Sequence, residues 1–196
     1  MHHIHHTEAF VLGSRPKGED SKILFLYARE LGLVYGHAQG LRKLSSKLRY
    51  VLQDFSRVQV DLVRGKEVWR VTTAVPAHSV GADASLPQES LKVVARIAAL
   101  VVRLVAGEEA NEEVYGTLTR AYALLSRPNL APEDLRALEL LTVARILTAL
   151  GYLSRERPGL VSEPHAEETI PKEFGDIAYQ HRLVRDINQA LAATQL

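Results

Sequence analysis

The sequence predicts an α+β protein, in which a small five-stranded barrel precedes an all-helical domain. Within the first 76 of the 196 residues, short apolar runs and period-two alternation recur between turns. Pro76 ends this pattern, and from residue 85 onward apolar side chains recur at helical spacing. We therefore expect a barrel at residues 1–76, a linker at 77–84 and a helical bundle at 85–196, with an irregular segment at 154–172.

Five strands are expected in the first part of the chain. Tight or breaker-rich turns separate most of them, and one longer connection joins the third strand to the fourth. This arrangement is typical of the OB-fold barrel, although an SH3-like barrel has a similar number of strands. The expected strands are Ile4–Ser14, Ser21–Tyr27, Leu33–Ala38, Asp54–Val63 and Val68–Val75.

Four helices are expected in the second part. Ser85 and Gln88 stand as a capping box before the first helix, which is apolar on most of its circumference and is therefore expected at the centre of the bundle. Pro132 suits the first turn of the third helix, and Gly151 suits its end. The expected helices are Glu89–Val105, Asn111–Ser126, Ala131–Gly151 and Phe174–Ala193.

The two parts of the chain differ in charge. Residues 1–76 hold 12 Lys/Arg against 7 Asp/Glu, a balance of +5, whereas residues 77–196 hold 12 against 16, a balance of −4. A polyanion is therefore expected to meet the barrel. The chain has no cysteine, which excludes disulfides, thiolate metal sites and cysteine nucleophiles. No signal peptide or membrane span is recognisable, and we expect a cytoplasmic protein.

The longer connection is basic and carries no acid between Gly36 and Arg49. Cations on a loop beside aromatic side chains suit a phosphate backbone and its bases, although a solvated basic turn is the alternative. Tyr35, Tyr50 and Phe55 are candidates for base stacking, and each could instead be a core or rim residue of the barrel. Trp69 is expected in the core. The expected nucleic-acid contacts in the connection are Arg42, Lys43, Lys47 and Arg49.

No residue set indicates catalysis. The carboxylates between Glu108 and Glu113 are explained by the start of a helix. The turn from Gly13 to Gly18 lacks the Lys-Ser/Thr pair that a phosphate-binding loop requires. The serines lack a nucleophile elbow, and the histidines follow no metal-ligand spacing. We expect no enzymatic activity, no metal and no cofactor.

Several segments, taken in order, resemble the RecO family of bacterial recombination mediators. The resemblance is dense over residues 7–73, and Leu147–Tyr152 is similar to the "LGY" end of that family's central helix. Many members carry a four-cysteine zinc module after that point, whereas Ser154–Lys172 holds no cysteine, so zinc is not expected. The segments that carry the resemblance are Thr7–Arg15, Gly18–Lys22, Arg29–Val34, Gly40–Lys43, Ser46–Leu48 and Leu147–Tyr152.

The resemblance implies an OB-fold barrel and a helical domain without enzymatic turnover. It implies binding of single- and double-stranded DNA in the nucleoid, annealing of complementary strands, and help to RecA on DNA coated by single-strand-binding protein. The implied protein partners are RecR and the C-terminal tail of single-strand-binding protein. By position, Arg15, Lys17 and Arg29 join the four connection cations as candidate DNA contacts. Two alternatives stay open: an RNA-binding or other single-stranded nucleic-acid-binding OB module, and an interaction scaffold that acts through the helical half.

Overall fold

The computed structural model describes residues 3–77, 86–156, 160 and 169–193. These residues form two compact units. The described parts of Met1–Asp83 and Ala98–Asn111 make up the first unit, and those of Ala84–Ile97 and Glu112–Leu196 make up the second. Each described helix is too short or too polar to cross a membrane.

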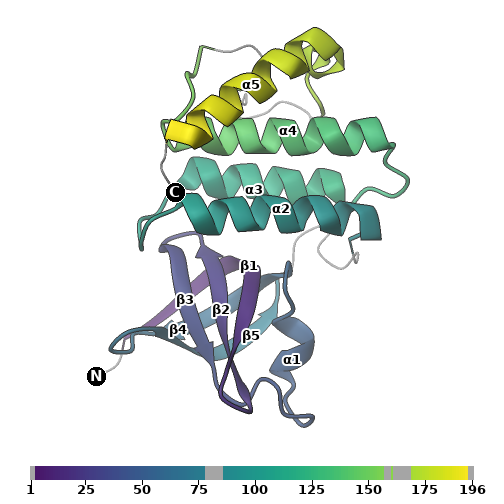
Figure 1. The fold of residues 1–196 in the computed structure, drawn as a ribbon. Coiled ribbons are helices and arrows are strands. Elements are labelled where there is room, and N and C mark those ends of the chain that lie inside the picture. Colours follow the sequence, from purple (N-terminus) through teal and green to yellow (C-terminus); the bar gives the residue numbers. More distant parts are fainter. Residues whose placement is uncertain (1–2, 78–85, 157–159, 161–168, 194–196) are drawn as a thin grey trace. The chain divides into compact units, whose positions relative to one another are not determined.

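The first unit contains a closed β-barrel with strand order β1-β2-β3-β5-β4 (Figure 1). Neighbouring strands are antiparallel except β3 and β5, which pair in parallel. This topology, with a short helix between β3 and β4, confirms the predicted OB-fold and excludes the alternative based on strand count alone. The elements are β1 (Ile4–Lys17), β2 (Ser21–Ala28), β3 (Gly32–Ala38), α1 (Leu48–Val51), β4 (Arg57–Val63) and β5 (Trp69–Pro76).

The first strand is long because it serves both halves of the barrel. Its start pairs with β4 and its end pairs with β2, with a register shift between Val11 and Gly13. A bulge of this kind bends a strand and helps a sheet to close. The strand therefore continues to Lys17, three residues beyond the predicted end. By contrast, β4 begins three residues later than predicted, after a turn in which Phe55 has a φ of +69°.

The barrel core is built from the inward-facing apolar residues of all five strands, and Trp69 belongs to it as expected. Leu48 and Val51 of α1 pack against this core, so the short helix covers part of the barrel (Figure 1). The sequence did not predict α1, because four residues are too few to show a helical period.

The segment that follows α2 (Gln88–Leu104) belongs to the barrel unit. The Trp69 Nε1–H donates to Glu108 Oε1 at 3.0 Å, and Arg64 forms an ion pair with the same carboxylate. The Tyr27 hydroxyl donates to the carbonyl of Asn111 at 3.4 Å. Because α3 (Glu112–Leu125) begins only at Glu112, the interpretation of Glu108 as a helix-start charge was wrong. The Glu108 carboxylate instead attaches this segment to Trp69 of β5 and to Arg64, the residue after β4.

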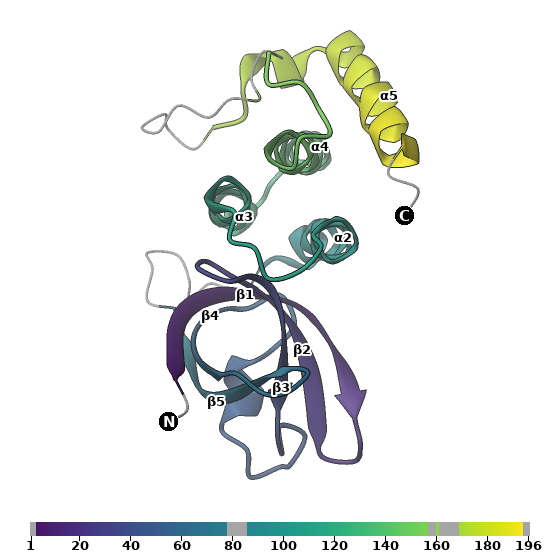
Figure 2. The same cartoon turned by 90° about the vertical axis from the view of Figure 1, so that its left-hand side faces the viewer.

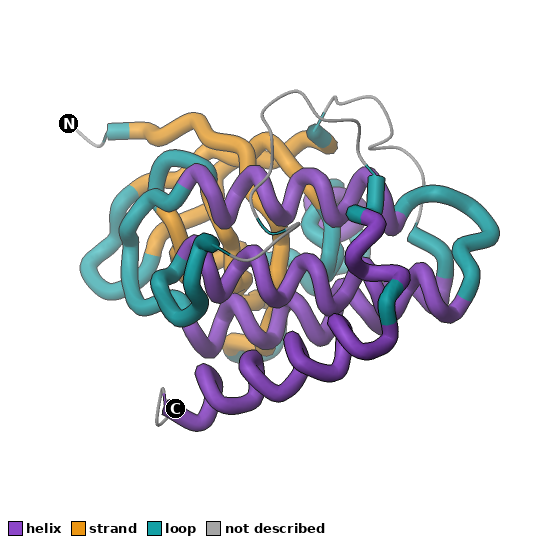
Figure 3. The backbone as a smooth tube through the Cα atoms, turned by 90° about the horizontal axis from the view of Figure 1, so that it is seen from above, coloured by secondary structure: helices purple, strands orange, loops and turns teal. Residues whose placement is uncertain are grey.

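In the second unit the helix covered from two sides is α4. It contacts α3, and it also contacts α5 and the short 3₁₀ helix η1; α5 crosses α4 obliquely (Figures 2 and 3). The predicted Pro132 start and Gly151 end of α4 are confirmed, the glycine having a φ of +82° just after the helix. The elements are α3 (Glu112–Leu125), α4 (Pro132–Ala149), η1 (Lys172–Gly175) and α5 (Ile177–Ala193).

The first helix is not the centre of the bundle, so that prediction was wrong. Charged side chains recur along α2 at helical spacing and stay exposed. Arg96 among them binds both carboxylate oxygens of Glu139 on α4, at 2.6 Å each. The last helix starts at Ile177 rather than at Phe174, because η1 precedes it. The proposed cap Ser85 and most of segment 154–172 lie outside the described residues, although Leu160 within that segment is buried.

Candidate nucleic-acid interface

Two aromatic side chains lie together on the outer face of β2 and β3. The register sets Phe25 opposite Tyr35, and the flanking residues Leu24, Leu26 and Val34 point into the core, so both rings point outward. The rings meet edge to face with centroids 5.5 Å apart, and Tyr35 is 42% exposed. On the other side of Phe25, β1 presents a glycine. An accessible aromatic pair on this face is a platform on which a base can stack.

A second row of residues crosses the same outer face, and three of its four members are basic. The register aligns Arg15 of β1, Ile23 of β2, His37 of β3 and Arg70 of β5. This row lies two residues from the aromatic row, which is about 6.6 Å along a strand. Lys17 follows Arg15 on the same face. Within the described part of the chain, no acid pairs with the three long cations of this face, which are Arg15, Lys17 and Arg70.

The pKa of His37 shows that two cations of this face act on the same side chain. Burial lowers the pKa of His37, and the charges of Lys17 and Arg70 lower it further. Two strands far apart in the sequence thus bring their cations close enough to act on one imidazole. A surface where unpaired cations converge attracts anions.

Two of the predicted cations join this face at the turn between β1 and β2. The Arg42 backbone N–H donates to the Asp20 carbonyl at 2.8 Å, and its guanidinium donates to the Gly18 carbonyl at 3.3 Å. The Lys43 ammonium lies 3.5 Å from the Asp20 carboxylate, with both side chains more than half exposed. These contacts hold Arg42 and Lys43 at the tip of the hairpin that carries Lys17.

The other two predicted cations lie at α1. Because Leu48 and Val51 face the core, Lys47, Arg49 and Tyr50 are left toward solvent. The Arg49 guanidinium lies 5.2 Å from the centre of the Tyr50 ring, and that ring is 69% exposed. Among the described residues, no acid pairs with Lys47 or Arg49.

Two predicted residues are placed elsewhere. Arg29 follows the last residue of β2, so the length of that strand separates it from Lys17 and the hairpin tip. Phe55 stands in the turn before β4, where its backbone N–H donates to the carbonyl of Val11 in β1 at 2.7 Å. The positive φ of Phe55 is the left-handed backbone conformation by which the chain turns before β4.

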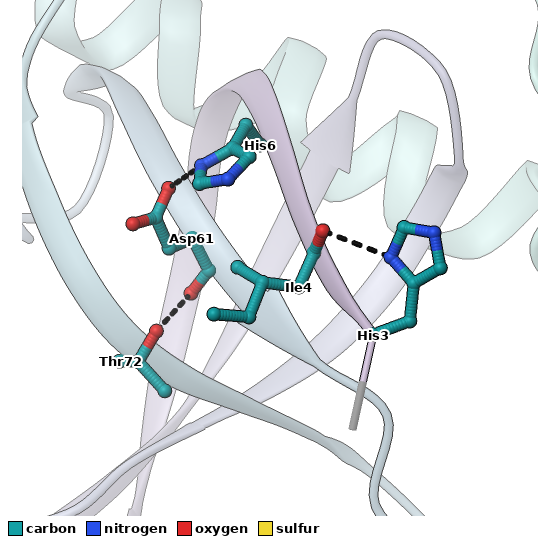
Figure 4. A network of polar contacts seen from close by, with 5 residues as sticks. All are labelled: His3, Ile4, His6, Asp61 and Thr72. Atoms are coloured by element: carbon teal, nitrogen blue, oxygen red, sulfur yellow. Dashed lines mark hydrogen bonds and ion pairs between the residues drawn. The ribbon is translucent and has the colours of Figure 1, made fainter. Parts of the chain in front are cut away.

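The outer face formed by β1, β4 and β5 differs in its charges. His6 Nδ1 lies 2.6 Å from Asp61 Oδ1, and Thr72 donates to the backbone carbonyl of Asp61 at 3.2 Å (Figure 4). On the same face, Arg57 pairs with Glu8 at 2.6 Å. Basic groups here already have acidic partners, so this face offers less to a polyanion than the face with Arg15, Lys17 and Arg70.

Sequence reasoning missed three residues of the interface: Phe25, His37 and Arg70. Phe25 lies within the expected strand Ser21–Tyr27 but has no assigned role there, and the histidines are considered only as metal ligands. The alternation of Tyr35 and His37 within one strand was a usable signal, but their partners on β2 and β5 depend on register. The described residues contain no group of three histidines or acids that could hold a metal ion.

Comparison with known proteins gives one consistent result. The family model described as "Recombination protein O N terminal" matches residues 1–80. A DNA repair protein RecO of Heliobacterium modesticaldum is 33% identical over 151 residues, which are 76% of this chain and 52% of the relative. Those of Pelotomaculum thermopropionicum and Aromatoleum aromaticum are 32% and 33% identical over 76% of this chain, and the alignments cover 56% and 59% of these relatives. The chain therefore spans between half and three fifths of the length of these relatives.

Proposed function

Since the chain belongs to the RecO family, we propose that its barrel binds DNA without sequence preference and anneals complementary strands during repair and recombination. The observation that carries the proposal is the pair of adjacent rows on one outer face of the barrel. The Phe25–Tyr35 row supplies ring surfaces, and the Arg15–His37–Arg70 row supplies positive charge. Stacking and phosphate contact tolerate any base, which is what an annealing protein requires.

Annealing requires two polyanions to approach each other. Cations that contact phosphates release condensed counterions, and the logarithm of the affinity falls with the logarithm of the salt concentration by about 0.7 per phosphate on single strands. The four predicted connection cations give a slope of about −3, and adding Arg15, Lys17 and Arg70 brings it to about −5 if all seven engage.

The further steps of the proposal follow from family membership. We propose that the protein helps RecA onto DNA coated by single-strand-binding protein, with the tail of that protein and RecR as partners. We expect binding and exchange rather than turnover chemistry, because the interface consists of stacking and cationic groups without a nucleophile beside a general base. An RNA-binding module and an interaction scaffold are the competing functions, and the experiments below separate them.

Binding is tested with a fluorescently labelled oligo-dT strand and the full chain at several salt concentrations. We expect Arg15→Glu/Arg70→Glu to weaken binding by at least tenfold at low salt and to flatten the salt slope. The matched control is Arg136→Glu/Arg182→Glu, which reverses two exposed charges in the second unit. Equal affinity of the parent and the barrel variant would remove this face from the function and favour the scaffold.

Annealing is tested with two complementary strands, bare or coated with single-strand-binding protein. We expect the chain to accelerate duplex formation, and we expect the barrel variant to lose most of that acceleration while the control keeps it. An RNA-binding module or a simple coating protein would bind one strand without accelerating annealing, and this result would contradict the proposal.

A further inference from the structure

His37 lies at the centre of the cationic row. Its register partner on β5 is Arg70, and its register partner on β2 is the buried, apolar Ile23. From β1, Lys17 acts on it electrostatically, and Arg15 stands on the far side of Ile23. Lys22 precedes Ile23 in β2; its ammonium donates to Ser14 at 3.1 Å and is thereby engaged toward β1.

The charged groups that face His37 from the neighbouring strands are therefore cations. Among the described residues, the charges that act on the imidazole come from Lys17 and Arg70, and neither pairs with an acid. In the free protein this arrangement, together with burial, keeps the imidazole neutral to lower pH than an ordinary histidine. A neutral imidazole beside the Lys17 ammonium and the Arg70 guanidinium leaves this group of three side chains one charge short of its maximum.

We propose that Lys17, His37 and Arg70 together bind one phosphate of the DNA backbone, and that His37 takes up a proton as the phosphate binds. This inference rests on the proposed function, since it concerns the same face of the barrel. The proton passes from buffer to an imidazole nitrogen, and no bond of the DNA is formed or broken. The barrel consequently holds DNA more tightly as the pH falls.

The physical reason is the reversal of the local field. A phosphodiester placed among the three side chains supplies a negative charge that opposes the repulsion from Lys17 and Arg70. The charged form of His37 is then favoured by its new neighbour, and its pKa rises on binding. By linkage, any group whose pKa rises on binding makes the affinity increase on acidification, by at most tenfold per pH unit for one proton.

The test measures oligo-dT affinity of the full chain between pH 8.0 and pH 5.5 at constant ionic strength. We expect the parent to bind about three- to tenfold more tightly at pH 5.5 than at pH 7.5. His37→Gln, which cannot titrate, should lose this dependence, whereas His37→Lys should bind tightly at all pH values. The control His181→Gln removes an exposed histidine of the second unit and should keep the parental dependence.

A second probe and a second readout make the result independent of how the variants fold. An oligonucleotide with an uncharged methylphosphonate backbone should show no pH dependence. The NMR resonance of the His37 ring should titrate at higher pH in the complex than in the free protein. If the parent binds DNA but His37→Gln shows the same pH profile, the inference fails while the proposed function stands. If the parent binds no DNA at any pH, both fail.

Discussion

Replacing Gly32 by alanine tests whether the segment after α2 is an integral part of the barrel unit. Gly32 begins β3 with a φ of +72°, a left-handed conformation that side chains disfavour. A Cβ built on this residue would lie 2.1 Å from the backbone oxygen of Glu109 and 2.7 Å from its carbonyl carbon. The obstacle is backbone, so the strand turn or the 105–111 segment must move.

The expected loss of stability has two parts. The left-handed conformation costs a non-glycine residue about 1–2 kcal/mol. Forcing a methyl group against packed backbone costs about 1–3 kcal/mol more. Gly107 separates the two parts, because it has a φ of +83° in the same segment but open space around the position of a Cβ. We therefore expect Gly107→Ala to lower the free energy of unfolding by about 1–2 kcal/mol and Gly32→Ala by about 2–5 kcal/mol.

The assay is denaturant unfolding followed by tryptophan fluorescence. Trp69 is the only tryptophan in the sequence, and it donates a hydrogen bond to Glu108 in the segment under test, so its emission reports both the barrel and the attachment. Equal losses in the two glycine variants would mean that Glu109 does not pack against Gly32. That result would refute the assignment of residues 105–111 to the barrel unit.

Three further predictions concern the outer face. Tyr35→Ala should weaken oligo-dT binding by about 1–3 kcal/mol at an unchanged salt slope. Tyr152 is a similarly exposed tyrosine of the second unit, and Tyr152→Ala should leave the affinity unchanged; anisotropy titrations check both variants. Arg70→Gln should make the salt slope shallower by about 0.7, whereas Arg136→Gln should leave it unchanged in the same titrations. Because the pKa of His37 is lowered in the folded protein, the unfolded chain binds more protons than the folded chain below about pH 6.5. The free energy of unfolding should therefore fall as the pH drops from about 6.5 toward the folded-state pKa of His37. Denaturant midpoints of the parent should show this loss of stability, and His37→Gln should show less of it.

The barrel could be predicted because its strands alternate and its turns are short. Period-two patterning does not depend on distant partners, so the five strands were found within three residues of their ends. Likewise Pro132 and Gly151 carry local backbone preferences that fix the ends of α4 whatever surrounds it. These features depend on residues close together in the chain, so a single sequence is enough to predict them.

The interface could be predicted only in part, because it depends on register. His37 meets Arg70 through a parallel pairing of two strands that are more than thirty residues apart, and Phe25 meets Tyr35 through the exact alignment of β2 with β3. A shift of the strand register by one residue would point the side chains of either row into the barrel core. The basic connection was visible as a run of charge, but the contribution of Arg70 was not, since its neighbours in the sequence are core residues.

The pairing of Lys43 with Asp20 gives the strictest test of the basic connection. A half-exposed ion pair of this kind contributes about 0–1 kcal/mol to stability, so a DNA phosphate can displace the Asp20 carboxylate from Lys43. The carboxylate still repels phosphates that approach. Asp20→Asn removes that repulsion and releases Lys43 beside Arg42 and Lys17. We expect about three- to tenfold tighter binding of oligo-dT at low salt, declining at high salt as screening increases. Glu133→Gln removes an equal charge from an exposed position on α4 and should have no such effect. Unchanged or weaker binding by Asp20→Asn would mean that the hairpin tip does not face the DNA.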